Sequence, residues 1–155
     1  MKEKWRAAVT ACMLIAFCGC GSGQSEIPLK NSGDIVSTVF LSVTSDAGDN
    51  PQAVDMAMKF AGFSLDEGRR VVMFFNVKGV TVPGTALSED FAWQDNQPIR
   101  TQLAALIKRG VDVHVCPICM KALGVEEKDL MEGAKVTTRP SLFANINTGT
   151  VVFTY

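Results

Sequence analysis

The fold of this chain is decided by the stretch Gly110-Val111-Asp112-Val113-His114-Val115-Cys116-Pro117-Ile118-Cys119. Its first part alternates between apolar and polar residues, which predicts a buried strand over Val111–Val115. The residues from Met120 to Leu123 are typical of a short helix that ends at Gly124. We therefore expect a pair of thiols at the point where a strand ends and a helix begins.

Working outward from this stretch, four further segments predict strands. Ile35–Val43 and Val71–Val77 are almost continuously apolar or β-branched, as in strands that are buried on both faces. Ala134–Val136 predicts a brief strand, and Thr150–Tyr155 predicts the last one. The chain thus contains enough strand segments for one sheet.

Between the strands, apolar residues recur with helical spacing. Asn50 and Pro51 suit the N-cap and first position of a helix. One face of this helix is formed by Val54, Ala57, Met58 and Ala61, and a second apolar line by Met56, Phe60 and Phe63. Two apolar faces indicate either a wide core stripe or a helix that another subunit covers.

Later segments continue the alternation of strands and helices. A helix is expected from Pro98 to Gly110, and shorter ones over Ser88–Trp93 and Glu126–Glu132, in an otherwise irregular region from residue 78 to 97. This order predicts a single three-layer α/β domain over residues 34–155. It would contain a mostly parallel sheet of about five strands with helices on both faces, in flavodoxin-like layering.

The N-terminal segment has the pattern of an export signal. Three basic side chains within residues 1–6 precede the apolar stretch 7–17, which predicts a signal peptide over residues 1–19. Gly19 before Cys20 resembles a lipoprotein signal, in which Cys20 receives lipid and residues 20–33 form a flexible tether. We expect an exported lipoprotein, anchored to the membrane and facing the periplasm or cell exterior. An ordinary secretory signal and an uncleaved anchor are the alternatives.

The predicted signal determines which cysteines would remain in the mature protein. Of five cysteines, Cys12 and Cys18 would leave with the signal and Cys20 would carry lipid, so Cys116 and Cys119 remain. One close pair is no disulfide scaffold, and it is better explained by reactivity or metal binding. Removing residues 1–19 leaves 12 Lys and Arg against 15 Asp and Glu, without a basic stripe, so we expect no nucleic-acid partner.

The order of residues in the pair suits thiolate chemistry. With Cys116 as N-cap and Pro117 at the first helical position, the unpaired N–H groups of the helix start favour a thiolate on Cys116. Cys119, at the third position, is near enough to resolve a disulfide, persulfide or sulfenic acid formed on Cys116. Two buried, inert cysteines are the structural alternative.

Two further residues are candidates for this site. His114 lies two positions before Cys116, so His114, Cys116 and Cys119 form a possible set of ligands for zinc or copper, although a fourth ligand is not evident. A packed core histidine is the alternative. Arg139 follows a predicted strand end and is a candidate for binding an anionic sulfur substrate, with an ordinary surface arginine as the alternative. No cofactor is expected.

These residues resemble the DsrE/DsrF-like family of small α/β proteins over Ile35–Tyr155. The resemblance rests on the stretch from Gly110 to Cys119, the amphipathic helix before it and the closing strand. It implies a five-stranded, mainly parallel sheet, assembly into trimers or hexamers, and a persulfide-carrying cysteine at a strand end, the position that Cys116 matches. The relay proteins of the family are cytoplasmic, whereas this chain has the sequence pattern of an export signal and lipid anchor, and a second cysteine, Cys119.

The resemblance and the residues together predict an extracytoplasmic DsrE-like protein that handles sulfane sulfur or thiol redox equivalents through Cys116 and Cys119. Such a protein would act as a sulfurtransferase or a thiol-disulfide carrier. A thiol or sulfur-carrier protein is its expected partner. The alternatives are a soft-metal module and a non-catalytic subunit of a DsrE-type oligomer.

Overall fold

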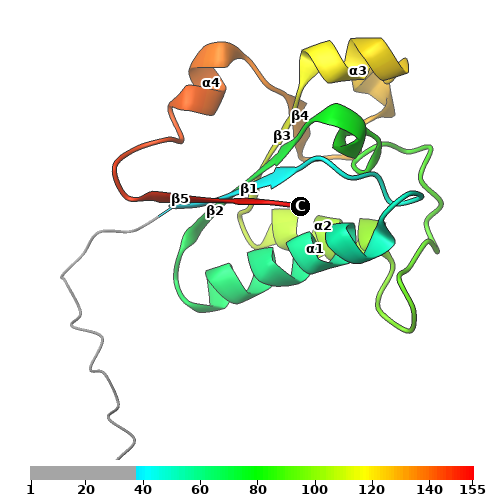
Figure 1. The fold of residues 1–155 in the computed structure, drawn as a ribbon, viewed down its shortest axis with the longest axis horizontal. Helices are drawn as coiled ribbons and strands as arrows, with labels where there is room; N and C mark the ends of the chain where they lie inside the picture. Colours follow the sequence, from blue (N-terminus) through cyan, green and yellow to red (C-terminus); the bar gives the residue numbers. More distant parts are fainter. Residues whose placement is uncertain (1–37) are drawn as a thin grey trace, which may run out of the picture. The chain divides into compact units, whose positions relative to one another are not determined.

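A computed structural model describes residues 38–155 of the chain and shows one five-stranded sheet (Figure 1). The strands are β1 (Thr38–Val43), β2 (Arg70–Phe75), β3 (Asp112–Val115), β4 (Ala134–Val136) and β5 (Thr150–Thr154). They lie in the order β4-β3-β2-β1-β5, and every neighbouring pair is parallel. The predicted parallel sheet is therefore confirmed.

Helices cover both faces of this sheet, as the sequence predicted (Figure 1). The long helices α1 (Pro51–Asp66) and α2 (Ile99–Lys108) lie together on one face. The short helices α3 (Pro117–Leu123) and α4 (Arg139–Phe143) lie on the other. Two 3₁₀ helices, η1 (Val77–Thr81) and η2 (Glu127–Asp129), complete the described elements.

The main core lies between the sheet and the two long helices. Alternate residues of the central strands, among them Leu41, Met73 and Val113, are almost fully buried against this layer. The predicted inner face of α1 is also buried: Val54, Ala57, Met58 and Ala61 are each at most 2% exposed. Each large side chain buried here contributes about 1.5–3 kcal/mol of transfer free energy, so this layer holds the sheet in place.

Helix α1 begins and faces its neighbours as its sequence predicted. The Asn50 side chain accepts a hydrogen bond from the Ala53 amide at 3.2 Å, and Pro51 occupies the first turn. On the second apolar line, Phe60 packs edge-to-face on Phe153 of β5, with ring centroids 4.6 Å apart. Phe63, by contrast, is 58% exposed. The second line thus continues from the edge of the sheet to the protein surface.

Four local predictions need correction. Ser88–Trp93 forms turns and irregular structure rather than a helix, because six residues, three of them polar, bury too little apolar surface to offset the cost of helix nucleation. The helix predicted over Glu126–Glu132 is only the 3₁₀ turn Glu127–Asp129. The predicted strand Val71–Val77 ends at Phe75, and Val77 begins η1. Arg139–Phe143, which was not predicted as a helix, forms α4.

The predicted signal peptide, the tether and the lipidation site Cys20 lie outside the described residues. Within residues 38–155, no helix combines the length and the apolar character that a membrane span requires.

Candidate functional site

The candidate site lies where β3 passes into α3. The Cys116 amide donates a hydrogen bond to the Phe75 carbonyl at 2.9 Å, which extends the β2–β3 pairing to the last residue before the helix. Cys116 is the N-cap of α3 with an extended backbone, Pro117 is the first helical residue, and Cys119 is the third. This local order is the one that the sequence predicted, because proline tolerates a position without an N–H partner.

Both thiols of the pair are reduced and half-buried. Their side chains pack at the border of the hydrophobic core rather than inside it. The Cys116 side chain accepts no N-cap hydrogen bond from the start of α3. Cys116 is thus a partly exposed sulfur without a backbone donor from its own helix.

Cys119, in contrast, has a backbone donor from a different element. The amide of Val77, at the start of η1, donates to the Cys119 Sγ at 3.1 Å. Burial and a hydrogen bond with Cys116 both raise the pKa of the Cys119 thiol, and the Val77 amide opposes them by stabilising the thiolate. The surroundings of Cys119 therefore disfavour its thiolate relative to a free cysteine.

His114 does not face the thiols as a free ligand. It is 1% exposed, its Nδ1 lies 2.9 Å from the Thr137 hydroxyl, and its Nε2 lies 3.1 Å from a carboxylate oxygen of Asp112. Within residues 38–155 no group of three or more His, Cys, Asp or Glu side chains is arranged to hold a metal ion. The geometry therefore gives no support to a metal site of His114, Cys116 and Cys119.

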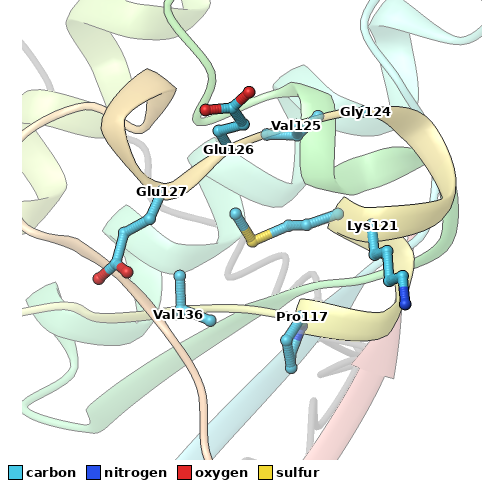
Figure 2. Close-up of a pocket in the computed structure, with 8 residues that line it drawn as sticks. Pro117, Lys121, Gly124, Val125, Glu126, Glu127 and Val136 are labelled. Atoms are coloured by element: carbon cyan, nitrogen blue, oxygen red, sulfur yellow. The ribbon is translucent and has the colours of Figure 1, made fainter.

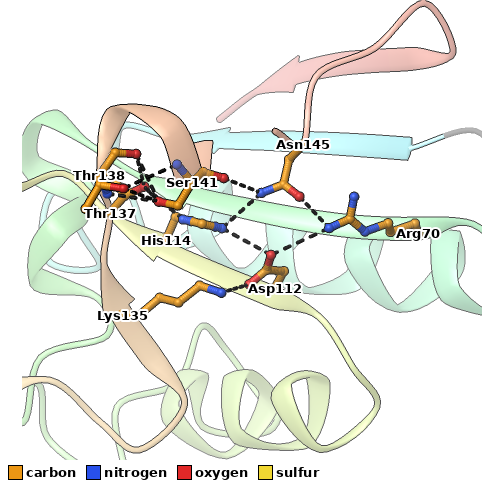
Figure 3. Close-up of polar contacts among 8 residues, drawn as sticks. All are labelled: Arg70, Asp112, His114, Lys135, Thr137, Thr138, Ser141 and Asn145. Carbon is orange, nitrogen blue, oxygen red and sulfur yellow. Dashed lines mark hydrogen bonds and ion pairs between the residues drawn. The ribbon is translucent and has the colours of Figure 1, made fainter. Parts of the chain in front are cut away.

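Asp112 is the charged centre of this polar cluster (Figure 3). Its carboxylate accepts from Lys135 Nζ at 2.5 Å and lies 3.7 Å from Arg70 Nη2. Burial raises the pKa of this carboxyl, but the Lys135 and His114 contacts outweigh burial, so the pKa lies below its ordinary value. Asp112 is therefore an ionised partner for His114.

Asn145, in the turn after α4, joins the same cluster. Its amide nitrogen donates to the Ser141 carbonyl at 3.0 Å and lies 3.1 Å from His114 Nε2, while its oxygen accepts from Arg70. The arrangement fits a His114 ring that donates from Nε2 to Asp112 and accepts at Nδ1 from Thr137. This cluster fastens α4 to the sheet and leaves the thiol pair outside it.

Arg139 is the first residue of α4 and is exposed. The helix start is formed by its neighbours, because Thr138 and Ser141 exchange side-chain to backbone hydrogen bonds in a capping box. Among the described residues no hydrogen bond joins Arg139 to either sulfur. Its role in binding an anionic substrate stays a prediction.

A cleft of about 450 Å³ lies beside the site, between α3, the segment after it and the end of β4 (Figure 2). Its lining combines the apolar Pro117 and Val136 with the charged Lys121, Glu126 and Glu127. Neither cysteine lines it. The cleft therefore lies next to the thiol pair but does not contain it.

Two parts of this region were not found by sequence reasoning. Val77 was placed at the end of a strand, and no pattern indicates that its amide lies against a sulfur 42 positions later. The polar cluster had a partial signal, because Asp112 and His114 lie two apart on one strand and so share a face. Thr137 and Asn145 gave no such signal, since only the packing of α4 brings them to His114.

Comparisons with known proteins agree with this architecture. The DsrE/DsrF-like family model matches residues 38–155. An uncharacterized protein of Methanocaldococcus jannaschii, MJ0989, is 33% identical over 119 residues, which cover 75% of this chain and 98% of that protein.

Two solved structures share the fold. The ychN protein from E. coli superposes with a TM-score of 0.61 at 16% identity, covering 77% of this chain and 98% of its own. MTH1491 from Methanobacterium thermoautotrophicum, a protein of unknown function, superposes with a TM-score of 0.56 at 18% identity, covering 76% and 97% of the two chains. With the family match and the parallel sheet together, the chain belongs to the DsrE/DsrF-like family.

Proposed function

We propose that this protein handles sulfane sulfur or thiol redox equivalents through Cys116 and Cys119. The observation that carries the proposal is the pair of reduced, half-buried cysteines at the carboxyl end of β3, one of which accepts a backbone hydrogen bond from Val77. In open parallel sheets, ligands bind at the carboxyl ends of the strands. The DsrE/DsrF-like fold and the position of the pair therefore support the same site.

In the proposed reaction, the Cys116 thiolate attacks the outer sulfur of a persulfide donor, R–S–SH. A Cys116 persulfide forms and the donor leaves as R–S⁻. The Cys119 thiolate then attacks Sγ of Cys116 and expels HS⁻, which closes a Cys116–Cys119 disulfide. The transferred sulfur is reduced to sulfide while the two thiols are oxidised, so a dithiol partner must reduce the pair before the next cycle.

The experiment exposes the reduced full chain to a small-molecule persulfide and follows intact mass and released sulfide. We expect the wild type to release sulfide and lose two hydrogens as the disulfide closes. Cys119→Ser should retain one extra sulfur atom, and Cys116→Ser should gain none while remaining folded. Equal sulfur uptake by wild type and Cys116→Ser would refute the proposal.

The site of action proposed here is outside the cytoplasm, on a lipid anchor at Cys20. The support is the sequence alone: basic residues, an apolar stretch of signal length and Gly19 before Cys20. Intact mass of the protein from a membrane fraction tests it, with Cys20→Ala as the control that cannot be lipidated. A wild-type protein without lipid would contradict this localisation.

A protein partner and self-association are part of the proposal. Around the thiol pair, Ile118 is 79% exposed and Val77 is 54% exposed, an apolar rim that favours contact with a thiol or sulfur-carrier protein. Away from it, Phe63 of α1 and Val151 and Val152 of β5 are at least half exposed. These exposed apolar side chains on α1 and on both faces of β5 support a homo-oligomer, which we propose to be a trimer or hexamer.

A further inference from the structure

Val77 has a backbone conformation that its residue type rarely adopts. Its φ is 51°, in the left-handed region, where the Cβ of a β-branched residue crowds the backbone. Among residues 38–155, only Gln94 is a second non-glycine residue with positive φ. A conformation of this kind persists only where the surrounding structure enforces it.

The residues on both sides of Val77 supply that enforcement. The Asn76 amide donates to the Val43 carbonyl at 3.0 Å, and the Asn76 side chain donates to the Ser42 hydroxyl at 2.8 Å. Two residues later, the Gly79 amide donates to the Thr44 carbonyl at 3.1 Å. The chain is thus fastened to the end of β1 both before and after Val77.

Gly79 tightens this attachment further. A Cβ on Gly79 would lie 2.1 Å from the Val43 carbonyl oxygen, so η1 approaches β1 as closely as only glycine allows. Backbone, not a flexible side chain, stands in the way. The segment from Asn76 to Gly79 therefore cannot turn without breaking its contacts with β1.

This arrangement directs the Val77 N–H toward a sulfur of the candidate site. The Val77 nitrogen lies 3.1 Å from Sγ of Cys119, whereas the sulfur of Cys116 receives no N-cap hydrogen bond from its own helix. The two sulfurs thus differ in their surroundings: a fixed backbone amide holds one, and the other lacks a donor from the helix it begins. Such an amide needs no reorganisation when negative charge develops on the sulfur that it contacts.

We propose that Val77 is a positioning residue whose amide holds the Cys119 sulfur and stabilises it as the leaving thiolate when the Cys116–Cys119 disulfide is opened. An incoming thiolate, R–S⁻, attacks Sγ of Cys116, a Cys116–S–S–R bond forms, and the electron pair of the broken bond leaves on Cys119 Sγ, against the Val77 N–H. Cys116 is then the sulfur that exchanges with the partner. This assignment of roles rests on the proposed function, but the contact between amide and thiolate does not.

A hydrogen bond to a thiolate has a direct spectroscopic signature. In full-length, reduced Cys116→Ser protein, Cys119 is the ionising member of the pair. We expect the Val77 amide proton resonance to move with pH, with the same midpoint as the alkylation rate of Cys119 by iodoacetamide. In Cys119→Ser protein that movement should vanish. A Val77 resonance that stays constant while Cys119 ionises would overturn the proposal.

Two variants test the consequence for redox equilibrium. Gly62→Ala lies on α1, outside the site, and its added Cβ would come no closer than 3.7 Å to a neighbouring atom, so its dithiol–disulfide equilibrium with glutathione should match the wild type. Gly79→Ala forces η1 away from β1. At a pH high enough to ionise Cys119 in the dithiol, it should shift that equilibrium about tenfold toward the disulfide, the size expected for losing one hydrogen bond to a charged sulfur. The proposal would be contradicted by a Gly79→Ala protein that meets two conditions. It is folded and its Val77 amide resonance no longer moves when Cys119 ionises, yet its dithiol–disulfide equilibrium equals that of the wild type.

The outcome separates this inference from the sulfur-handling function. If the wild type takes up no sulfur from a persulfide but its Val77 amide resonance follows the ionisation of Cys119, the proposed function is refuted. The role of the Val77 amide as hydrogen-bond donor to the Cys119 thiolate is then still supported. If instead the wild type takes up sulfur and the Val77 resonance does not follow Cys119, the role proposed for Val77 is refuted and the proposed function is supported. If Gly79→Ala does not fold, the amide titration of the Cys116→Ser protein decides alone.

Discussion

The Nε2 atom of His114 lies 3.1 Å from the Oδ2 atom of Asp112, two residues earlier on β3. Both side chains point to the face of the sheet that α4 covers (Figure 3). His114 is buried, and both its ring nitrogens have partners. The single histidine of this chain therefore serves to attach α4 to the sheet, which separates it from the chemistry of the neighbouring thiols.

Replacing His114 by alanine should destabilise the fold strongly. The change leaves a cavity and removes a hydrogen-bond partner from Asp112 and Thr137, which together cost about 3 kcal/mol of unfolding free energy. Urea unfolding measures this loss. The exposed Lys121→Ala on α3 is the control and should stay within about 0.5 kcal/mol of the wild type. A His114→Ala protein as stable as this control would show that the cluster does not hold α4.

Asp112→Asn should change how stability depends on pH. The pKa of Asp112 is lower in the folded protein than in the unfolded chain, so its contribution is full above the unfolded value of about 4. The contribution is lost as pH falls through the lower, folded value. We expect the difference in unfolding free energy between wild type and variant to be largest at pH 7 and to decrease as the pH is lowered. A difference independent of pH would contradict the ionised state of Asp112.

Gly79→Ala should lower stability although it adds only one methyl group. Its Cβ would overlap the Val43 carbonyl, and backbone displacement of this kind costs about 1–3 kcal/mol. Gly62→Ala is the matched control, because the nearest atom to its Cβ, on Arg109, is 3.7 Å away and Gly62 lies inside α1. It should gain about 0.5–1 kcal/mol from helix propensity. Thermal unfolding that moves both variants in the same direction would contradict this difference.

Phe63→Glu should dissociate the proposed oligomer. The side chain is 58% exposed on α1, and a carboxylate there would have to be buried in any interface that covers this face. Sedimentation velocity should show the wild type as an oligomer and the variant as a monomer. Leu123→Glu, at an apolar position on α3 that is 47% exposed, should leave assembly unchanged. A monomeric wild type would remove the basis of the proposal.

Much of the architecture was predictable because it depends on local patterns. The apolar runs of β1 and β2 and the periodicity of α1 each indicate one element and one buried face. The thiol pair was predictable for the same reason, because Pro117 and Gly124 mark the two ends of α3 around Cys119. The prediction failed for segments with a weak sequence pattern. Helix α4, for example, depends on contacts with β3 rather than on any periodicity of its own.

What the sequence determined by itself is a parallel α/β domain with two cysteines at the end of its third strand, because hydrophobic spacing and helix caps act over a few neighbouring residues. Tertiary structure alone decided which sulfur receives a backbone donor and which partners surround His114. Val77 meets Cys119 across 42 positions and Asn145 meets His114 across 31. Such contacts form when strands distant in the sequence pair, so the pattern of neighbouring residues does not predict them.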